Sequence, residues 1–138
     1  MQSLTPIATN LCFAHVGGIS NEQTNFAAIK RCAELTKSPM KQFLVRSLSS
    51  ATDLPYFVGN RSQLIIFGGR LEFEITQFVL GAIPHGYHIF LLVDAVGAEE
   101  ESHAQLCLER LYQFGVVPIL TKQLFWELGL HNTLADLG

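Results

Sequence analysis

The sequence predicts a three-layer αβα fold, in which helices cover both faces of a mostly parallel sheet of about five to six strands. Short apolar runs alternate along the chain with segments whose apolar residues recur at helical spacing, which is typical of a parallel α/β layer. Two of these runs, residues 64–67 and 89–93, are apolar throughout, as expected of strands covered on both faces. The 138 residues are enough for one core, so we expect a single domain over residues 1–138.

The N-terminal half is expected to contribute a strand, a helix and a shorter strand. Residues 11–16 form an apolar run that ends at a pair of glycines, which indicates a first strand. Ser20 and Gln23 are spaced as in a capping box, and the helical pattern that follows them extends to Pro39. Two further short elements are expected next: a strand over residues 43–45 and a brief helix or turn over residues 51–58.

Two helices in the C-terminal half are predicted from their apolar stripes. The first follows the strand at residues 64–67, and the second follows the strand at residues 89–93. In both, apolar residues recur at spacings of three and four, so one face of each helix should lie against the sheet. The first stripe is Leu71, Ile75, Phe78, Val79 and Ala82, and the second is Ala104, Cys107, Leu108 and Leu111.

The pattern ends with an edge strand and a closing helix. Residues 116–120 are the last apolar run, and Pro118 places this strand at an edge because proline has no N–H to donate. Thr121 is expected to cap the closing helix. The buried side chains of that helix should be Leu124, Phe125 and Leu128.

Composition and charge argue against several kinds of partner. The net charge is −3 and no block of Lys and Arg occurs, so no nucleic-acid partner is expected. The longest apolar run, residues 89–93, is far too short to span a bilayer, and the N-terminus lacks the regions of a signal peptide. We therefore expect a cytoplasmic protein without a membrane partner. Charged residues make up only 15% of the chain, which favours surface buried in a homo-oligomer.

Neither a metal nor a cofactor is expected from the spacing of possible ligands. The cysteines fit neither a metal site nor a redox pair, and we interpret them as buried thiols. They are Cys12, Cys32 and Cys107. The acidic residues 99–101 lie at the start of a predicted helix. Their favourable interaction with the helix dipole explains them better than metal binding. His85, His88 and His103 form no spaced ligand set.

A ligand site is expected at the carboxyl ends of the parallel strands. Open α/β sheets bind ligands there, near the point at which the strand order reverses. The loops after residues 16, 67 and 93 should therefore lie together. Gly17 and Gly69 belong to glycine pairs in the first two loops, and we interpret both pairs first as turns and second as places where a ligand approaches the backbone.

Residues 64–95, LIIFGGRLEFEITQFVLGAIPHGYHIFLLVDA, resemble the central unit of the isochorismatase-like cysteine hydrolases. That unit has an apolar strand, a glycine, a short polar turn, the nucleophilic Cys, a helix, a Gly-Tyr or Gly-Phe pair, a second apolar strand and Asp-Ala. Every feature is present except the Cys, whose place is taken by Glu74. The resemblance covers nearly half of the chain and continues through Asp94, Ala95, Arg110, Gly115, Thr121 and Phe125.

The N-terminal half resembles the family more loosely. The family keeps a catalytic Asp at the end of its first strand, and His15 falls there. In the family, the catalytic Lys precedes a short sequence pattern, and part of that pattern is present at residues 49–54. The basic residue near this pattern is Arg46, with Lys41 as another candidate. In the family, the connection between the second and third strands usually helps to close the substrate pocket. Much of that connection is absent here, between residues 39 and 51.

Each replaced residue has two explanations. The family's Cys attacks an amide as a thiolate at a helix N-terminus, and its Asp shuttles the proton. Glu74 either acts in a site as acid, base or nucleophile, or only accepts N–H groups at the helix start. His15 is either a general base paired with Glu74 or a strand-end His bonded to the backbone. Arg46 either binds an anion or Glu74, or is a solvated or packed arginine.

The remaining site candidates have simpler assignments. Glu72 is expected to face solvent or to cap the turn, and Asp94 to hold the turn after its strand through side-chain to backbone bonds. The resemblance implies that Gly17, Gly69 and Arg70 contact a small-molecule substrate.

Three functions remain open. The one that we favour is a divergent homologue, impaired as a cysteine hydrolase, with a role in binding or assembly. The alternative is an active small-molecule hydrolase of the isochorismatase type, in which Glu74, His15 and Arg46 support acid-assisted cleavage without a thiol nucleophile. The third is a pure interaction subunit that buries apolar faces, including Phe125 and Trp126, against copies of itself.

Overall fold

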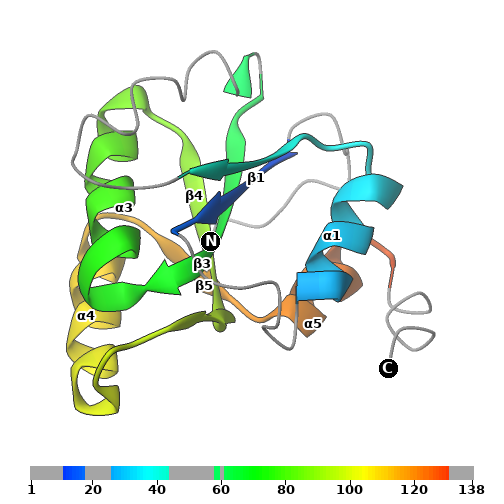
Figure 1. The fold of residues 1–138 in the computed structure, drawn as a ribbon. Coiled ribbons are helices and arrows are strands. Elements are labelled where there is room, and N and C mark those ends of the chain that lie inside the picture. The colour runs from blue at the N-terminus through cyan, green and yellow to red at the C-terminus, as the bar shows by residue number, and fades with distance from the viewer. Residues whose placement is uncertain (1–10, 18–25, 44–57, 60, 131–138) are drawn as a thin grey trace.

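The computed structural model describes residues 11–17, 26–43, 58–59 and 61–130, which form a five-stranded parallel sheet between helices (Figure 1). The strands are β1 (Leu11–Val16), β2 (Met40–Phe43), β3 (Gln63–Arg70), β4 (His88–Gly97) and β5 (Val117–Ile119). The helices are α1 (Phe26–Leu35), α3 (Thr76–Ala82), α4 (Glu101–Gln113) and α5 (Thr121–Glu127). A π-helical turn, η3 (Leu71–Ile75), precedes α3, and a 3-10 turn, η4 (Ile83–His85), follows it.

The strand order is β2-β1-β3-β4-β5, and every neighbouring pair is parallel. This confirms the predicted α/β class. From β1 the chain moves outward to β2 and then returns to place β3 on the other side of β1, so the strand order reverses between β1 and β3. β5 lies at an edge of the sheet, as Pro118 predicted.

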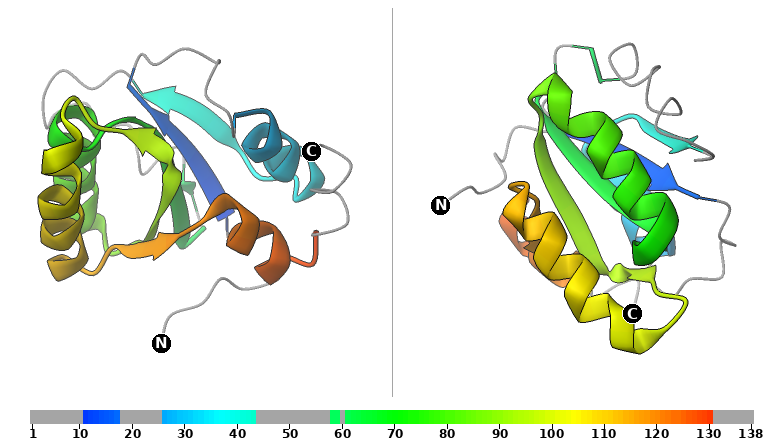
Figure 2. Two further views of the ribbon diagram at one scale, coloured as in Figure 1. Left: turned by 90° about the horizontal axis from the view of Figure 1, so that it is seen from below. Right: turned by 90° about the vertical axis from the view of Figure 1, so that its left-hand side faces the viewer.

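Helices cover both faces of the sheet, as predicted (Figure 2). α3 and α4 pack on one face, whereas α1 and α5 pack on the other. Successive side chains of β1 point to opposite faces of the sheet, so they contribute alternately to the two cores. Cys12 and Ala14 belong to the core under α3 and α4, and Phe13 belongs to the core under α1 and α5.

The predicted apolar stripes lie against the sheet. The stripe of η3 and α3 is buried throughout: Leu71, Ile75, Phe78, Val79 and Ala82. In α4, Leu111 is buried, and the other members of the stripe are half-buried against the same core. Among the described residues, no helix is long and apolar enough to cross a membrane.

α1 ends earlier than predicted. Its last residue is Leu35, whereas the sequence pattern extended to Pro39. Lys37 has a φ of 54°, in the left-handed region, so the right-handed helix cannot continue through it. The predicted cap residues Ser20 and Gln23 lie outside the described part of the chain.

β2 also lies earlier than predicted, at Met40–Phe43 and not at residues 43–45. Met40 is placed opposite Phe13 of β1, so the pairing begins almost directly after the turn that ends α1. Of the element predicted over residues 51–58, the structure describes only Val58, which is buried.

β3 and β4 are longer than predicted, and Gly68-Gly69 lies inside β3 and not in a turn. Gly68 pairs with Val16 on one side and with Val96 on the other. The register shifts on both sides of Gly68, and the φ angles of Gly68 and Gly69 are 94° and 30°. A bulged strand end, and not the expected turn, therefore explains this glycine pair.

The closing helix starts differently from the prediction. Thr121 is the first residue of α5 and not its cap. Its N–H and Oγ1 donate to Oδ1 of Asp94 at 3.0 and 2.9 Å. Asp94 was expected to hold the turn after its own strand, and these two hydrogen bonds tie β4 to α5. The N–H of Leu120, the residue before α5, donates to Oε1 of Gln123 at 2.8 Å.

Candidate functional site

The carboxyl ends of β1 and β3 meet where the strand order reverses, which is where open parallel sheets bind ligands. Gly17 follows β1, and a Cβ on it would lie 3.2 Å from Cα of Gly69 and 3.4 Å from Cγ of Glu74. A Cβ on Gly69 would lie 3.2 Å from Cβ of Glu74. Gly17, Gly69 and Glu74 are therefore neighbours, and the missing side chains of the glycines leave room for Glu74.

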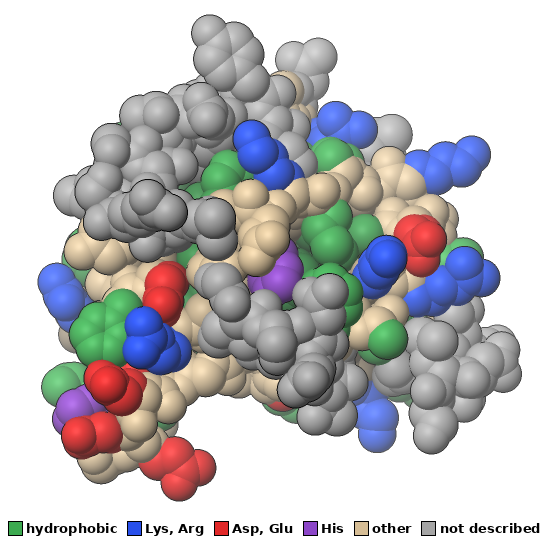
Figure 3. All heavy atoms as spheres, viewed as in Figure 1, with side chains coloured by type: hydrophobic (Ala, Val, Ile, Leu, Met, Phe, Trp, Pro, Cys, Tyr) green, Lys and Arg blue, Asp and Glu red, His purple; other side chains and the backbone are tan. Residues whose placement is uncertain are grey.

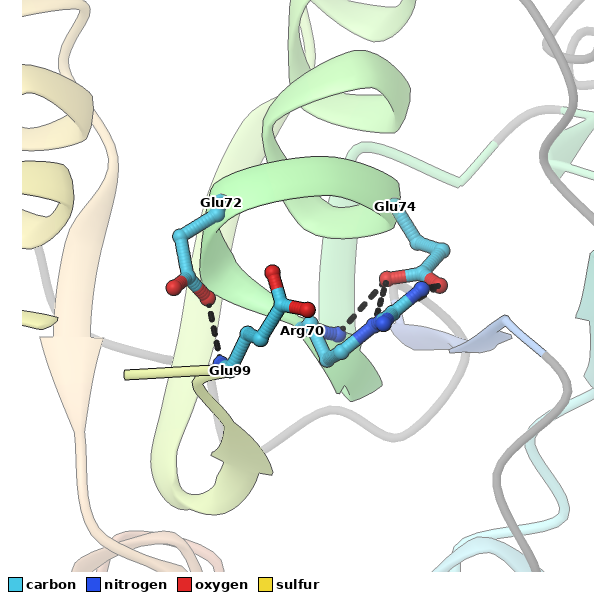
Figure 4. Close-up of polar contacts among 4 residues, drawn as sticks. All are labelled: Arg70, Glu72, Glu74 and Glu99. Carbon is cyan, nitrogen blue, oxygen red and sulfur yellow. Dashed lines mark hydrogen bonds and ion pairs between the residues drawn. The ribbon is translucent and has the colours of Figure 1, made fainter. Parts of the chain in front are cut away.

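Glu74 lies in η3, and its carboxylate is held by Arg70 (Figure 4). The backbone N–H of Arg70 donates to Oε2 at 2.9 Å, and Nη2 and Nε of its guanidinium donate to Oε1 at 2.8 and 3.3 Å. Arg70 directly precedes the first helical turn, so Glu74 reaches back to an N–H group at the helix entrance. This contact matches the helix-start explanation that the sequence offered for Glu74.

The contact with Arg70 keeps Glu74 ionised. The Glu74 side chain is only 16% exposed. This burial raises the pKa of its carboxyl, but the hydrogen bonds from the Arg70 side chain and backbone outweigh burial and hold the pKa below its ordinary value. Near neutral pH, Glu74 is therefore a hydrogen-bond acceptor and carries no proton to donate.

Arg70 lies at the surface. Its side chain is 45% exposed, and the centre of its guanidinium lies 4.8 Å from the ring centroid of Phe73, which is 44% exposed. Arg70 and Glu74 were separate candidates in the sequence, and their pairing was not predicted. Their spacing of four residues was the available signal, because side chains four apart are neighbours on a helix surface.

His15 lies at the end of β1, on the sheet face covered by α1 and α5. Its ring stacks on Phe67 with a centroid distance of 4.9 Å, and Phe26 lies 5.2 Å away. The side chain is 4% exposed, and its Nε2 atom is buried without a hydrogen-bond partner in the described part of the chain. Burial lowers the pKa of the His15 imidazole, so the ring is neutral at neutral pH.

Gly68 and Gly69 lie between His15 and Glu74. A Cβ on Gly68 would lie 2.6 Å from Cδ2 of His15, whereas a Cβ on Gly69 would meet Glu74. Among the described residues, Arg70 and the backbone N–H of Glu74 itself donate to the Glu74 carboxylate, whereas Nε2 of His15 has no hydrogen-bond partner. The structure therefore brings both side chains to the same strand ends without joining them by a hydrogen bond through Nε2.

Glu72 caps the loop before α4, which was one of its two expected roles. The N–H groups of Glu99 and Glu100 donate to its carboxylate at 2.6 and 3.0 Å, and Nδ1 of His103 lies 3.1 Å from Oε2. Burial raises the pKa of Glu72, but these hydrogen bonds outweigh it and lower the pKa to about 2. Glu72 and Glu74 thus point to different sides of the first helical turn (Figure 4).

Acidic side chains gather around the start of α4, at the lower left of Figure 3. The capping bonds of Glu72 account for part of this cluster. Among the described residues, no group of three or more His, Cys, Asp or Glu side chains is placed to hold a metal ion.

The three thiols lie on three different elements. Cys12 is near the start of β1, Cys32 is in α1 and Cys107 is in α4. Cys12 and Cys32 are buried as predicted, but Cys107 is only half-buried because its helix stripe lies at the rim of the core. Burial raises the pKa of Cys12 to about 11 and that of Cys32 to about 12, so neither is a thiolate near neutral pH.

The sequence offered two candidates for the counterpart of the family's lysine. Arg46 lies outside the described residues. Lys41 lies in β2 with its Nζ atom 5.2 Å from the ring centroid of Phe43. Sequence reasoning missed Gln42, whose Nε2 donates to the carbonyl oxygen of Gly17 at 3.0 Å and so helps to fix the end of β1.

Comparison with known proteins establishes the fold. No protein-family model and no curated protein sequence matches this chain. Among solved structures, YcaC from Escherichia coli superposes with a TM-score of 0.74 at 19% identity, over 94% of this chain and 85% of its own. The chain has the isochorismatase-like fold. YcaC from Escherichia coli is a hydrolase of unknown specificity with this fold, so the resemblance noted in the sequence is confirmed at the level of the fold.

Two other solved structures share the isochorismatase-like fold with this chain. The MAR1 ribonuclease from Caenorhabditis elegans has a TM-score of 0.67 at 12% identity, over 99% of this chain and 92% of its own. The pyrazinamidase of Pyrococcus horikoshii has a TM-score of 0.51 at 20% identity, over 60% of this chain and 51% of its own. The chain thus matches the larger part of YcaC but only about half of the pyrazinamidase.

Proposed function

We propose that this chain binds a small molecule at the carboxyl ends of β1 and β3 and does not hydrolyse amides through a cysteine. The observation that carries the proposal is the ion pair between Glu74 and Arg70, with Nη2 of Arg70 2.8 Å from Oε1 of Glu74. From the sequence resemblance, Glu74 is expected at the position of the nucleophile. A carboxylate that is bound to a guanidinium and to a backbone N–H group cannot replace a thiolate there.

The cysteines support the same proposal. A thiol attacks as the thiolate, and the raised pKa values of Cys12 and Cys32 keep these two groups protonated. Burial also raises the pKa of Cys107, and the nearby Glu72 raises it further. No thiol of the described residues therefore offers an activated nucleophile for an amide.

The alternative proposal, an acid-assisted hydrolase that uses Glu74, His15 and Arg46, requires a protonated carboxyl group. Arg70 holds the pKa of Glu74 below its ordinary value, which removes that proton in the unliganded protein. His15 is neutral and buried, so it supplies no cation to replace the missing acid. These two observations make binding the better-supported function.

Amide turnover tests the proposal. The full chain would be incubated with nicotinamide or pyrazinamide, and ammonia release would be compared with that of a nicotinamidase at equal concentration. We expect release at the level of the buffer blank, both for the unmodified chain and for Glu74→Gln. Release that disappears in Glu74→Gln, or after alkylation of the cysteines, would overturn the proposal.

We also propose that the chain assembles with copies of itself. The E. coli YcaC structure is that of an octameric hydrolase, and this chain matches most of its length. Phe125 cannot take part as first expected, because it is fully buried in the protein's own core. Leu106 on α4 and Trp126 on α5 are 68% and 60% exposed and are the better candidates for an apolar contact.

A further inference from the structure

Arg61 carries a buried hydrogen-bond donor that has no acceptor. It lies two residues before β3, at the amino end of the sheet and therefore opposite to the candidate site. Its Nε atom is buried and makes no hydrogen bond with the described residues, and none of their carboxylates forms an ion pair with its guanidinium. A buried donor without an acceptor costs free energy. A bound ligand that supplies the acceptor would remove this cost.

The turn before β3 holds Arg61 against the core under α3 and α4. The N–H of Arg61 donates to the carbonyl oxygen of Val58 at 3.1 Å, and Sγ of Cys12 donates to the same oxygen at 3.9 Å. Val58 and Cys12 are fully buried in this core. Burial raises the pKa of the Cys12 thiol, and the positive charge of Arg61 opposes this rise. The half-buried Arg61 side chain is thus fixed at the rim of the core.

Tyr87 brings a second donor to the same rim. It directly precedes β4 and packs against the same core. The N–H of His88 donates to the carbonyl oxygen of Ser62 at 2.9 Å, so the segments that lead into β3 and β4 lie side by side. Burial raises the pKa of the Tyr87 hydroxyl, and the neighbouring Cys12 raises it further. The hydroxyl therefore keeps its proton near neutral pH and can donate it in a hydrogen bond.

The approach to these two donors is open and carries no negative side chain. Gly59 precedes Arg61 by two residues and Gly86 directly precedes Tyr87, and a Cβ on either glycine would meet nothing within 4 Å. The described residues of the two segments, 58–59, 61–62 and 83–88, include no Asp or Glu. No fixed carboxylate in these segments therefore competes for the guanidinium or repels an anion.

We propose that Arg61 and Tyr87 bind a small tetrahedral oxyanion, such as phosphate, at the amino end of the sheet. The guanidinium donates to two oxygens of the anion through Nε and one Nη atom, and the Tyr87 hydroxyl donates to a third. Donors from two segments can hold an anion from more than one side, which suits a tetrahedral group. The inference goes beyond the proposed function, because Glu74 lies at the other end of the strands.

Calorimetric titration of the full chain with inorganic phosphate tests the inference. The ionic strength is held constant with sodium chloride, and acetate serves as the planar anion. We expect phosphate to bind at millimolar concentration or below, and acetate to bind about tenfold more weakly or worse. In an NMR titration, phosphate should shift the backbone resonances of residues 58–62 and 86–88 and leave those of residues 70–76 in place.

Variants assign the binding to the two side chains. Arg61→Gln should weaken phosphate binding about tenfold or more, and Arg61→Lys should restore only part of it, because a lysine keeps the charge but not the paired donors. Tyr87→Phe keeps the ring in the core and should weaken binding about two- to tenfold, the range for one hydrogen bond. The unfolding temperature of each variant without phosphate shows that it folds.

Matched controls are Arg31→Gln and Tyr112→Phe. They remove an exposed arginine on α1 and the hydroxyl of a half-buried tyrosine on α4, and they should leave phosphate binding unchanged. Three results would overturn the inference: no phosphate binding at millimolar concentration, unchanged binding by both Arg61→Gln and Tyr87→Phe, or resonance shifts confined to residues 70–76. None of these results bears on amide turnover, so this inference and the proposed function can fail separately.

Discussion

At the scale of single residues, Glu74 shows how an acidic side chain at a helix start is tied to its surroundings. The sequence predicted it at a helix start after the strand at residues 64–67, and in the structure it lies beside Gly17 and Gly69. Arg70 decides whether Glu74 is a free acid or a hydrogen-bond acceptor at the helix start. The backbone N–H of Arg70 and two groups of its side chain, Nε and Nη2, all donate to the Glu74 carboxylate. Residue types and spacing suggest such a pair but do not decide which rotamers the two side chains adopt.

His15 makes stability depend on pH in a defined direction. Burial lowers its pKa from the ordinary value of 6.5, so folding favours the neutral ring. The stabilisation is fully present above about pH 6.5 and is lost as the pH falls from there through the lower pKa of the folded state. We expect the free energy of unfolding, measured by urea denaturation, to decrease over this acidic window.

Two variants assign this pH dependence to His15. His15→Phe keeps an aromatic ring against Phe67 and removes the titrating group, so it should abolish this part of the pH dependence. His88→Gln removes an exposed histidine and should retain the dependence. If His15→Phe follows the same curve as the unmodified chain, the assignment is wrong.

At the scale of elements, periodicity predicted most of the helices and strands but not their ends. The buried stripes of α3 and α4 followed directly from helical spacing. The ends depended on tertiary partners that lie far along the chain, such as Asp94, which receives two hydrogen bonds from Thr121. The bulged end of β3 was interpreted as a turn because glycines in turns and in bulges look alike in a sequence.

Gly68 is required at the end of β3 because His15 and the backbone of β1 leave no space for a side chain. A Cβ there would lie 2.6 Å from both Cδ2 of His15 and the carbonyl oxygen of Val16, and its φ of 94° disfavours other residues. We expect Gly68→Ala to lower the free energy of unfolding by about 3 kcal/mol or more, from strain and overpacking together.

Gly86→Ala is the matched control for this substitution. Gly86 has a φ of 79°, but a Cβ on it would meet nothing within 4 Å. Gly86→Ala should therefore lower the free energy of unfolding by only about 1 kcal/mol, the cost of backbone strain alone. Chemical denaturation of both variants gives the comparison, and equal losses would show that the contact with His15 and Val16 is unimportant.

At the scale of the whole molecule, the α/β class and parallel sheet could be predicted because the alternation of elements and the apolar strands are global features of the sequence. The shared fold with YcaC agrees with the resemblance found in the central unit. The site could be placed only at the level of strand ends, because its chemistry depends on contacts between side chains. A single domain over residues 1–138, a cytoplasmic location and the absence of a nucleic-acid partner stay predictions.

Assembly is tested by light scattering coupled to size exclusion. We expect the unmodified chain to elute as a homo-oligomer at micromolar concentration. Leu106→Glu should shift it toward the monomer if the exposed face of α4 is buried between copies. Lys122→Glu changes an exposed charge on α5 and serves as a control for surface charge. A monomer for the unmodified chain would contradict the assembly proposal.

The most direct test of the account is the pKa of the Glu74 carboxyl, measured by following its side-chain carbon resonance in an NMR titration, with Glu74→Gln to assign the signal. The Arg70 pair predicts a value below the ordinary 4.5 in the unliganded chain, and a higher value in Arg70→Gln, in which only the backbone N–H groups of residues 70 and 74 remain to oppose burial. A Glu74 pKa above 4.5 in the unmodified chain, unchanged by Arg70→Gln, would contradict the ion-paired carboxylate at the centre of this account.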